Sequence, residues 1–200
     1  MTALFVKTRL AFAVTTALFC SVALFAAGSS AASMASPAER DVLPAGASPQ
    51  LYQLTIDPDL QKLTFQGELT LDFNATQALD ELVLNALDLT IIDASLDGKK
   101  VNAEVVAETQ RVHFKAPVSA VKHQLRVRYQ GKIYEQSAGL FVTDYSKADG
   151  STGRMLSSQF EPGDARKLAP MWDEPLHKAI FKISIIEPKG QLALSNMPEQ

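Results

Sequence analysis

The sequence predicts an all-β domain, a sandwich of mostly antiparallel strands, preceded by a signal peptide. Apolar and polar residues alternate with a period of two through most of residues 51–130, which is the period of a strand with one buried face. Turn residues separate the alternating runs, and no window longer than a turn follows the helical period of about 3.6. The 200 residues, 46% of them hydrophobic, allow one sandwich-sized domain plus a leader.

Residues 1–35 have the pattern of a secretory signal peptide. Lys7 and Arg9 precede the apolar run 10–27, and small residues follow from Gly28 to Ala35. The run is long enough to span a bilayer, but its hydroxyl residues and the small residues after it favour cleavage, after Ala32 or Ala35. We therefore expect export, to the periplasm if the source is bacterial and otherwise by secretion, and no stable membrane anchor.

Residues 36–50 are expected to be an exposed linker, and residues 51–200 the folded domain. The linker contains three prolines and Gly46 and shows little periodicity. The first expected strand runs over 51–56 and ends at Asp57-Pro58. The clearest strand follows, with one apolar face made by Leu63, Phe65, Leu69, Leu71 and Phe73. Gly67 falls on that face, which predicts a bend or a close neighbour.

Shorter strands are expected over 82–84, 89–92, 101–106, 111–115 and 124–130, the last with Leu125, Val127 and Tyr129 pointing inward. Leu96-Asp97-Gly98-Lys99 is a hairpin signal. Residues 138–153 are rich in Gly, Ser, Asp and Lys and predict a long loop or a flexible hairpin. Alternation resumes over 181–185, and 192–194 is expected to form a last strand. Whether the domain is complete at its C-terminal end stays open.

Composition excludes several classes of function. The 19 basic and 22 acidic residues give a formal charge of -3, and no basic stripe is present, which argues against a nucleic-acid partner. The three histidines, His113, His123 and His177, form no His-Glu-x-x-His motif, so no metal site is expected in this segment. A nucleophilic serine or cysteine has no support, because Gly-x-Ser-x-Gly is absent and Cys20 lies in the leader.

The stretch 157–181 interrupts the alternation with three prolines and a series of charged residues. Its submotifs are Gln159 and Glu161, Ala165-Arg166, Ala169–Met171, Asp173-Glu174-Pro175 and Lys178–Phe181. In this order they resemble the signature of the N-terminal domain of the aminopeptidase N (alanyl aminopeptidase) family of zinc metallopeptidases. The family's usual aromatic residue and cysteine are replaced by Ala169 and Met171. The resemblance extends from about Leu51 to the end of the sequence.

The resemblance implies an elongated, saddle-like β-domain and a role in substrate binding. It places Glu161 on the α-amine of a peptide substrate and Gln159 at the S1 subsite. An α-amine with a pKa near 8 is mostly cationic at neutral pH, and a carboxylate binds it through hydrogen bonds worth about 1.5–3 kcal/mol. From the residues alone, Glu161 could instead cap a turn before Pro162. The zinc and the catalytic residues of the family belong to a later domain, so no catalytic residue is expected here.

The remaining signature residues are expected to be structural. Asp164 is placed to cap a short helical turn through Leu168. Arg166 is expected to bridge to the carboxylates beside Trp172, which are those of Asp173 and Glu174, and Pro175 follows them. Trp172 is expected to anchor the packing. The alternative is an acid/base cluster of paired carboxylates.

Two functional hypotheses follow. The first is the N-terminal domain of an exported zinc aminopeptidase that removes N-terminal amino acids from peptides, inactive without its catalytic domain. The second is a non-catalytic β-sandwich that serves as a binding or scaffold module, or a truncated gene product. A His-Glu-x-x-His motif in the coding frame beyond Gln200 would favour the first hypothesis, and a stop codon there would favour the second.

Overall fold

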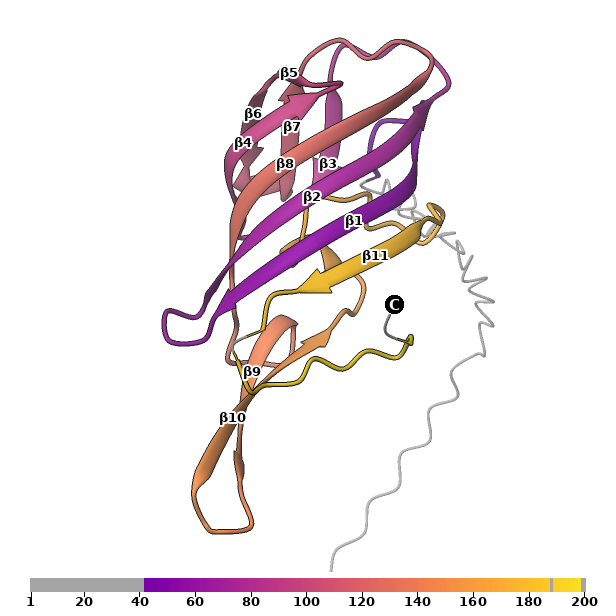
Figure 1. Cartoon of the computed structure of the whole chain (residues 1–200). Coiled ribbons are helices and arrows are strands. Elements are labelled where there is room, and N and C mark those ends of the chain that lie inside the picture. Colours follow the sequence, from indigo (N-terminus) through magenta and orange to yellow (C-terminus); the bar gives the residue numbers. More distant parts are fainter. Residues whose placement is uncertain (1–41, 188, 199–200) are drawn as a thin grey trace, which may run out of the picture. The chain divides into compact units, whose positions relative to one another are not determined.

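The computed structural model describes residues 42–187 and 189–198, and the predicted signal peptide and the first part of the predicted linker lie outside them (Figure 1). The predicted all-β class is confirmed. The strands are β1 (Ala47–Asp59), β2 (Thr64–Ala75), β3 (Leu82–Asn85), β4 (Thr90–Leu96), β5 (Lys99–Lys100), β6 (Asn102–Val106), β7 (Arg111–Lys115), β8 (Lys122–Lys132), β9 (Gly139–Ser146), β10 (Thr152–Gln159) and β11 (Ile180–Ile185), with short 3₁₀ helices η1 (Ala107–Thr109) and η2 (Ala165–Lys167). No helix in the described ranges is long and apolar enough to cross a bilayer.

The strands form three sheets. The largest has the order β11-β1-β2-β8-β4-β5, the second β3-β7-β6, and β9 pairs with β10 as a separate hairpin. All pairings between the described strands are antiparallel except β1 with β11. The three-stranded sheet lies behind the six-stranded sheet in Figure 1. Both sheets contribute to one buried core, which includes Leu71, Leu84, Phe114 and Leu125. This arrangement follows from strands that each carry one apolar face.

The central pair β2 and β8 has the predicted alternation. Phe65, Leu69, Leu71 and Phe73 are almost completely buried, as are Leu125, Val127 and Tyr129. Gly67 has the close neighbour that its place on the apolar face predicted. A Cβ at this position would lie 2.2 Å from Cζ of Tyr129, so the ring occupies the space that any larger residue would need.

Several predicted boundaries differ from the structure. Strand β1 continues through Pro58, which pairs with Phe65, to Asp59, beyond the expected end at Asp57-Pro58, and β4 continues to Leu96, beyond the expected range 89–92. Strand β1 begins at Ala47, before the expected start at Leu51, because residues 47–49 also pair with β2, across a register shift between Pro49 and Leu51. The prediction of a strand over residues 192–194 is wrong. Those residues form no strand, and Leu192 and Leu194 are 76% and 87% exposed. Alternation alone forms no strand without a paired neighbour, and none of the described strands pairs there.

The segment 138–153 forms the hairpin that was one of its two predicted structures. Strands β9 and β10 pair from Thr152–Ser146 to Gln159–Gly139. Arg154 donates two hydrogen bonds to Asp144, at 2.6 and 2.9 Å, across the hairpin. The hairpin carries the chain directly into the signature stretch, since Gln159 is the last residue of β10.

Candidate functional site

Gln159 and Glu161 lie together at the end of β10. Both side chains are exposed, and Nε2 of Gln159 donates to Oε1 of Glu161 at 3.3 Å. Strand β10 ends at Gln159, and Pro162 directly follows Glu161. Glu161 therefore lies at the start of a turn rather than within the sheet. A carboxylate in this position is accessible to a ligand.

A surface hollow of about 320 Å³ adjoins Glu161. Its apolar wall includes Tyr52 and Phe181, whose rings stack at 4.7 Å with an interplanar angle of 8°. Trp172 and His177 line it as well, with ring centroids 5.8 Å apart. Carboxylate side chains border this aromatic surface. The hollow can therefore receive a group that joins a positive charge to an apolar part.

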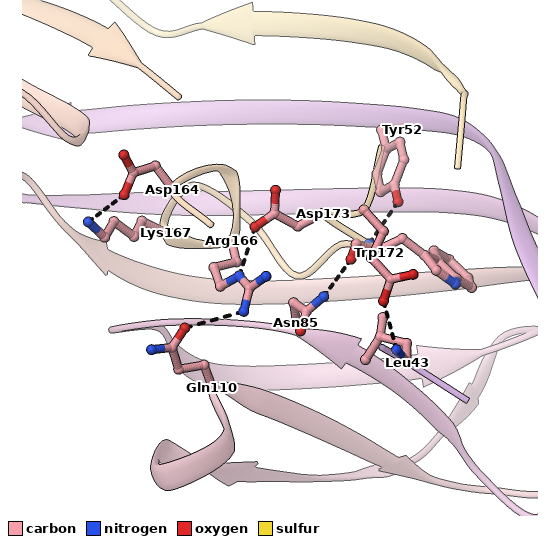
Figure 2. A network of polar contacts seen from close by, with 10 residues as sticks. Leu43, Tyr52, Asn85, Gln110, Asp164, Arg166, Lys167, Trp172 and Asp173 are labelled. Carbon is pink, nitrogen blue, oxygen red and sulfur yellow. Dashed lines mark hydrogen bonds and ion pairs between the residues drawn. The ribbon is translucent and has the colours of Figure 1, made fainter. Parts of the chain in front are cut away.

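Arg166 connects the signature stretch to the three-stranded sheet. Its Nε donates to Oδ2 of Asp173 at 2.7 Å, and its Nη1 donates to Oε1 of Gln110 at 3.2 Å (Figure 2). The Arg166 and Asp173 side chains are only 18% and 10% exposed. The Arg166 carbonyl also accepts a hydrogen bond from the N–H of Leu87, at 3.0 Å. These contacts fix the position of η2 against the sandwich.

Trp172 anchors the same stretch in the core. Trp172 is 2% exposed. Its backbone N–H donates to the hydroxyl of Tyr52 at 3.2 Å, and its backbone carbonyl accepts from Nδ2 of Asn85 (Figure 2). Met171 and Asn85 exchange two backbone hydrogen bonds, at 2.8 and 3.0 Å. Ala169 and Met171, the two departures from the family pattern, are both buried and contribute to the core.

The other carboxylates of the signature have different partners from those expected. Glu174, which we expected near Arg166, accepts from the N–H of Leu43 at 2.7 Å and lies 3.5 Å from Nε2 of His177, while Pro175 borders the hollow. Asp164 precedes η2 but makes no side-chain cap, because its backbone is already helical, with φ -95° and ψ -23°. Its Oδ1 instead accepts from Nζ of Lys167 at 2.7 Å, and this bond lowers the pKa of Asp164.

The described ranges do not fit a zinc site. They contain no group of three or more His, Cys, Asp or Glu side chains that could hold a metal ion. Each histidine lies beside one carboxylate instead: His113 beside Glu81 at 2.8 Å, His123 beside Asp97 at 2.6 Å, and His177 beside Glu174.

Sequence reasoning missed several residues that build the site. Tyr52, Asn85 and Gln110 reach the signature stretch from distant parts of the chain, and no local pattern marks them. Lys167 carried a local signal, since it follows Asp164 at a spacing of three residues, which allows an ion pair on a helical turn.

Comparison with known proteins gives a consistent set of relatives. A model of the peptidase M1 N-terminal domain family matches residues 48–200. The chain is 38% identical over 159 residues to "Aminopeptidase N" of Acetobacter pasteurianus, covering 78% of this chain and 45% of the relative. It is 36% identical over 168 residues to "Aminopeptidase 2" of Candida albicans, covering 81% and 18%, and 34% identical over 167 residues to "Aminopeptidase M1" of Arabidopsis thaliana, covering 78% and 19%. The chain thus spans less than half the length of these relatives.

Proposed function

Because the chain belongs to the peptidase M1 N-terminal domain family, we propose that it forms the N-terminal part of an exported zinc aminopeptidase. In this proposal the described domain binds the free N-terminal end of a peptide substrate. The zinc ion and the residues that activate water belong to a catalytic domain that follows it in the intact protein. The relatives named above are aminopeptidases that extend well beyond the length of this chain, which supports the proposal.

Glu161 binds the α-amine of the substrate. The observation that carries this assignment is the exposed Glu161 carboxylate at the edge of an aromatic hollow that Asp173 also lines. Its side-chain hydrogen bond comes from the neutral amide of Gln159, which leaves the negative charge uncompensated by that partner. An α-amine, mostly cationic below a pKa near 8, gains charge-assisted hydrogen bonds there, and an internal peptide group does not.

Gln159 contributes to the subsite for the first side chain of the substrate. It lies beside Glu161, so a peptide whose amine contacts Glu161 brings its first side chain close to Gln159. An amide offers both a donor and an acceptor and tolerates several side-chain types.

Glu161→Ala and Glu161→Gln in the full-length protein test the assignment. Charge-assisted bonds worth about 1.5–3 kcal/mol correspond to a loss of roughly 10- to 150-fold in kcat/KM for an alanyl anilide, while thermal unfolding stays unchanged. The control is Glu68→Ala, which removes another exposed carboxylate, from β2. Normal kinetics in both Glu161 variants would remove Glu161 from substrate binding.

The coding frame beyond Gln200 tests the proposal for the whole protein. We expect a His-Glu-x-x-His motif downstream, because such a helix supplies two zinc ligands and a general base. An in-frame stop codon directly after Gln200 would favour the non-catalytic docking module instead.

A further inference from the structure

The side chain of Lys167 contacts both ends of the segment that carries Gln159 and Glu161. Its aliphatic part crosses Gly139, where an added Cβ would lie 3.2 Å from both Cβ and Cδ of Lys167. Gly139 is the residue that pairs with Gln159 between β9 and β10. At its other end, Nζ of Lys167 binds Asp164 at 2.7 Å, and the N–H of Asp164 donates to the carbonyl of Glu161 at 2.9 Å. One side chain therefore links the strand before Glu161 to the turn after it.

A second set of contacts holds the Lys167 ammonium. It lies 5.0 Å from the ring centroid of Tyr134, close enough for a cation–π interaction. The Tyr134 hydroxyl donates to Oδ2 of Asp88 at 2.6 Å, and its backbone exchanges hydrogen bonds with Leu140 and Val142 of β9. Tyr134 is thus fixed to the same hairpin and to the loop before β4. The Lys167 ammonium is therefore held between the Asp164 carboxylate and the Tyr134 ring.

Shielding from solvent distinguishes this ion pair from a similar one elsewhere. The Asp164 and Lys167 side chains are 20% and 15% exposed, whereas those of Asp59 and Lys62, which form a pair of the same spacing and the same 2.7 Å length, are 38% and 78% exposed. Exposed pairs contribute little because water and salt screen them, and shielded pairs are screened much less. The chain therefore contains its own matched control.

We propose that Lys167 is a positioning residue for Glu161: it fixes the turn on which the Glu161 carboxylate meets the substrate amine, without touching the substrate. This inference rests on the proposed function. Weakening the link lets the turn move, and small displacements of a binding group can reduce catalytic efficiency severely.

Lys167→Met in the full-length protein tests the proposal, because methionine keeps an unbranched apolar side chain and removes the charge. We expect KM for an alanyl anilide to rise roughly tenfold, with a smaller change in kcat, and Lys167→Arg to restore most of the loss because arginine can still bind Asp164. Lys62→Met should change neither parameter. Asp164→Asn, which keeps the side-chain shape, should reproduce the effect of Lys167→Met. It takes the place of Lys167→Met in the test if Lys167→Met fails to fold.

A double-mutant cycle separates positioning from general structure. If Lys167 acts through Glu161, adding Lys167→Met to Glu161→Ala should cause no further loss, whereas independent effects would multiply. Losses that multiply would overturn the positioning role. Wild-type kinetics in both Lys167→Met and Asp164→Asn, with an impaired Glu161→Ala, would also overturn it. Either result leaves the proposed function intact. A Glu161→Ala variant with normal kinetics would overturn both.

Discussion

At the scale of single residues, two glycines and two aromatic rings decide how the central strands fit together. Phe65 of β2 lies opposite Gly131 of β8, and Tyr129 of β8 lies opposite Gly67 of β2. A Cβ on either glycine would meet the facing ring at 2.2 Å, and the two rings pack edge to face with centroids 6.2 Å apart. Each ring covers the glycine across from it, which is a known device for pairing strands that contain glycine.

Tyr129 carries an unfavourable feature in this arrangement, and Tyr129→Phe should relieve it. Its hydroxyl is buried and has no hydrogen-bond partner among the described residues. Burial also raises the pKa of the phenol, so the group stays neutral. Since an unpaired buried hydroxyl carries a desolvation penalty, the substitution should increase the free energy of unfolding by about 1 kcal/mol. Urea denaturation measures this change.

Tyr145→Phe provides the control for that measurement, because Tyr145 is 45% exposed and its hydroxyl can bind water. The free energy of unfolding of the Tyr145→Phe variant should stay within about 0.5 kcal/mol of that of the wild type. A loss of stability in Tyr129→Phe would mean that the hydroxyl has a partner that compensates its burial.

Single residues also show where sequence reasoning succeeds. The close neighbour of Gly67 was predictable because a glycine on an apolar face leaves a gap that the fold must fill. The Asp164 cap was not, because capping depends on whether the residue is extended, and the sequence does not fix that angle. The contribution of Lys167 depends on Gly139 and Tyr134, which are distant in the sequence.

At the scale of elements, His123 ties the hairpin of β4 and β5 to the start of β8. Its Nδ1 lies 2.6 Å from Oδ2 of Asp97 in the hairpin turn, and its Nε2 lies 2.9 Å from the carbonyl of Ser119. The ring stacks on Phe73 of β2, with centroids 5.4 Å apart. Nδ1 faces a carboxylate, and Nε2 faces a carbonyl and also the Ser119 hydroxyl, 3.3 Å away, so the imidazolium can donate from both ring nitrogens.

This geometry predicts a pH dependence of stability. Burial opposes the charged form, but the hydrogen bonds to Asp97 and to the Ser119 carbonyl outweigh it and raise the pKa of His123 above 6.5. For Asp97, burial is likewise outweighed by hydrogen bonds from the Gln124 N–H and His123, which lower its pKa below 3.8. The stabilisation by His123 is therefore complete below 6.5 and is lost as the pH rises through the raised pKa. That by Asp97 is complete above 3.8 and is lost on acidification through the lowered pKa.

His123→Gln should accordingly be most destabilising between these two values, by about 1 kcal/mol more than at alkaline pH. Thermal or urea unfolding of both proteins across the pH range measures the difference. For comparison, His113→Gln removes a histidine that also lies beside a carboxylate, on β7, but whose side chain is 23% exposed, against 6% for His123. A destabilisation by His123→Gln that does not vary with pH would exclude the charged form from the contact.

Strand positions were largely predictable from the sequence, whereas pairing was not. The period of two located β2, β7 and β8 because each has one buried face. It could not anticipate that β1 continues back to Ala47 through a bulge, or that β11 pairs in parallel with β1. Both depend on partners that are far away in the chain.

At the scale of the whole molecule, the core face of the large sheet continues onto β11 without a cover. Strand β11 lies beside β1 at the edge of this sheet (Figure 1). Its residues Phe181, Ile183 and Ile185 pair with the buried Tyr52, Leu54 and Ile56, yet they are 50%, 55% and 40% exposed. Alternation over 181–185 thus marks an apolar face, as the sequence indicated, but the described residues do not bury it. An apolar row at a sheet edge is an aggregation hazard unless something covers it.

The proposed function predicts that a following domain covers the part of this face formed by Ile183 and Ile185, and the greater length of the relatives supports this expectation. Ile183→Lys in the full-length protein then places a charge in an interface, and we expect the thermal midpoint to fall by several degrees and protease cleavage to increase. Ile92→Lys is the control, because Ile92 lies on β4 and is 54% exposed, almost the same as Ile183. If β11 lies in an interface, Ile183→Lys should lower the thermal midpoint more than Ile92→Lys does. Equal thermal midpoints and equal protease cleavage in the two variants would mean that the β11 face stays open to solvent in the intact protein.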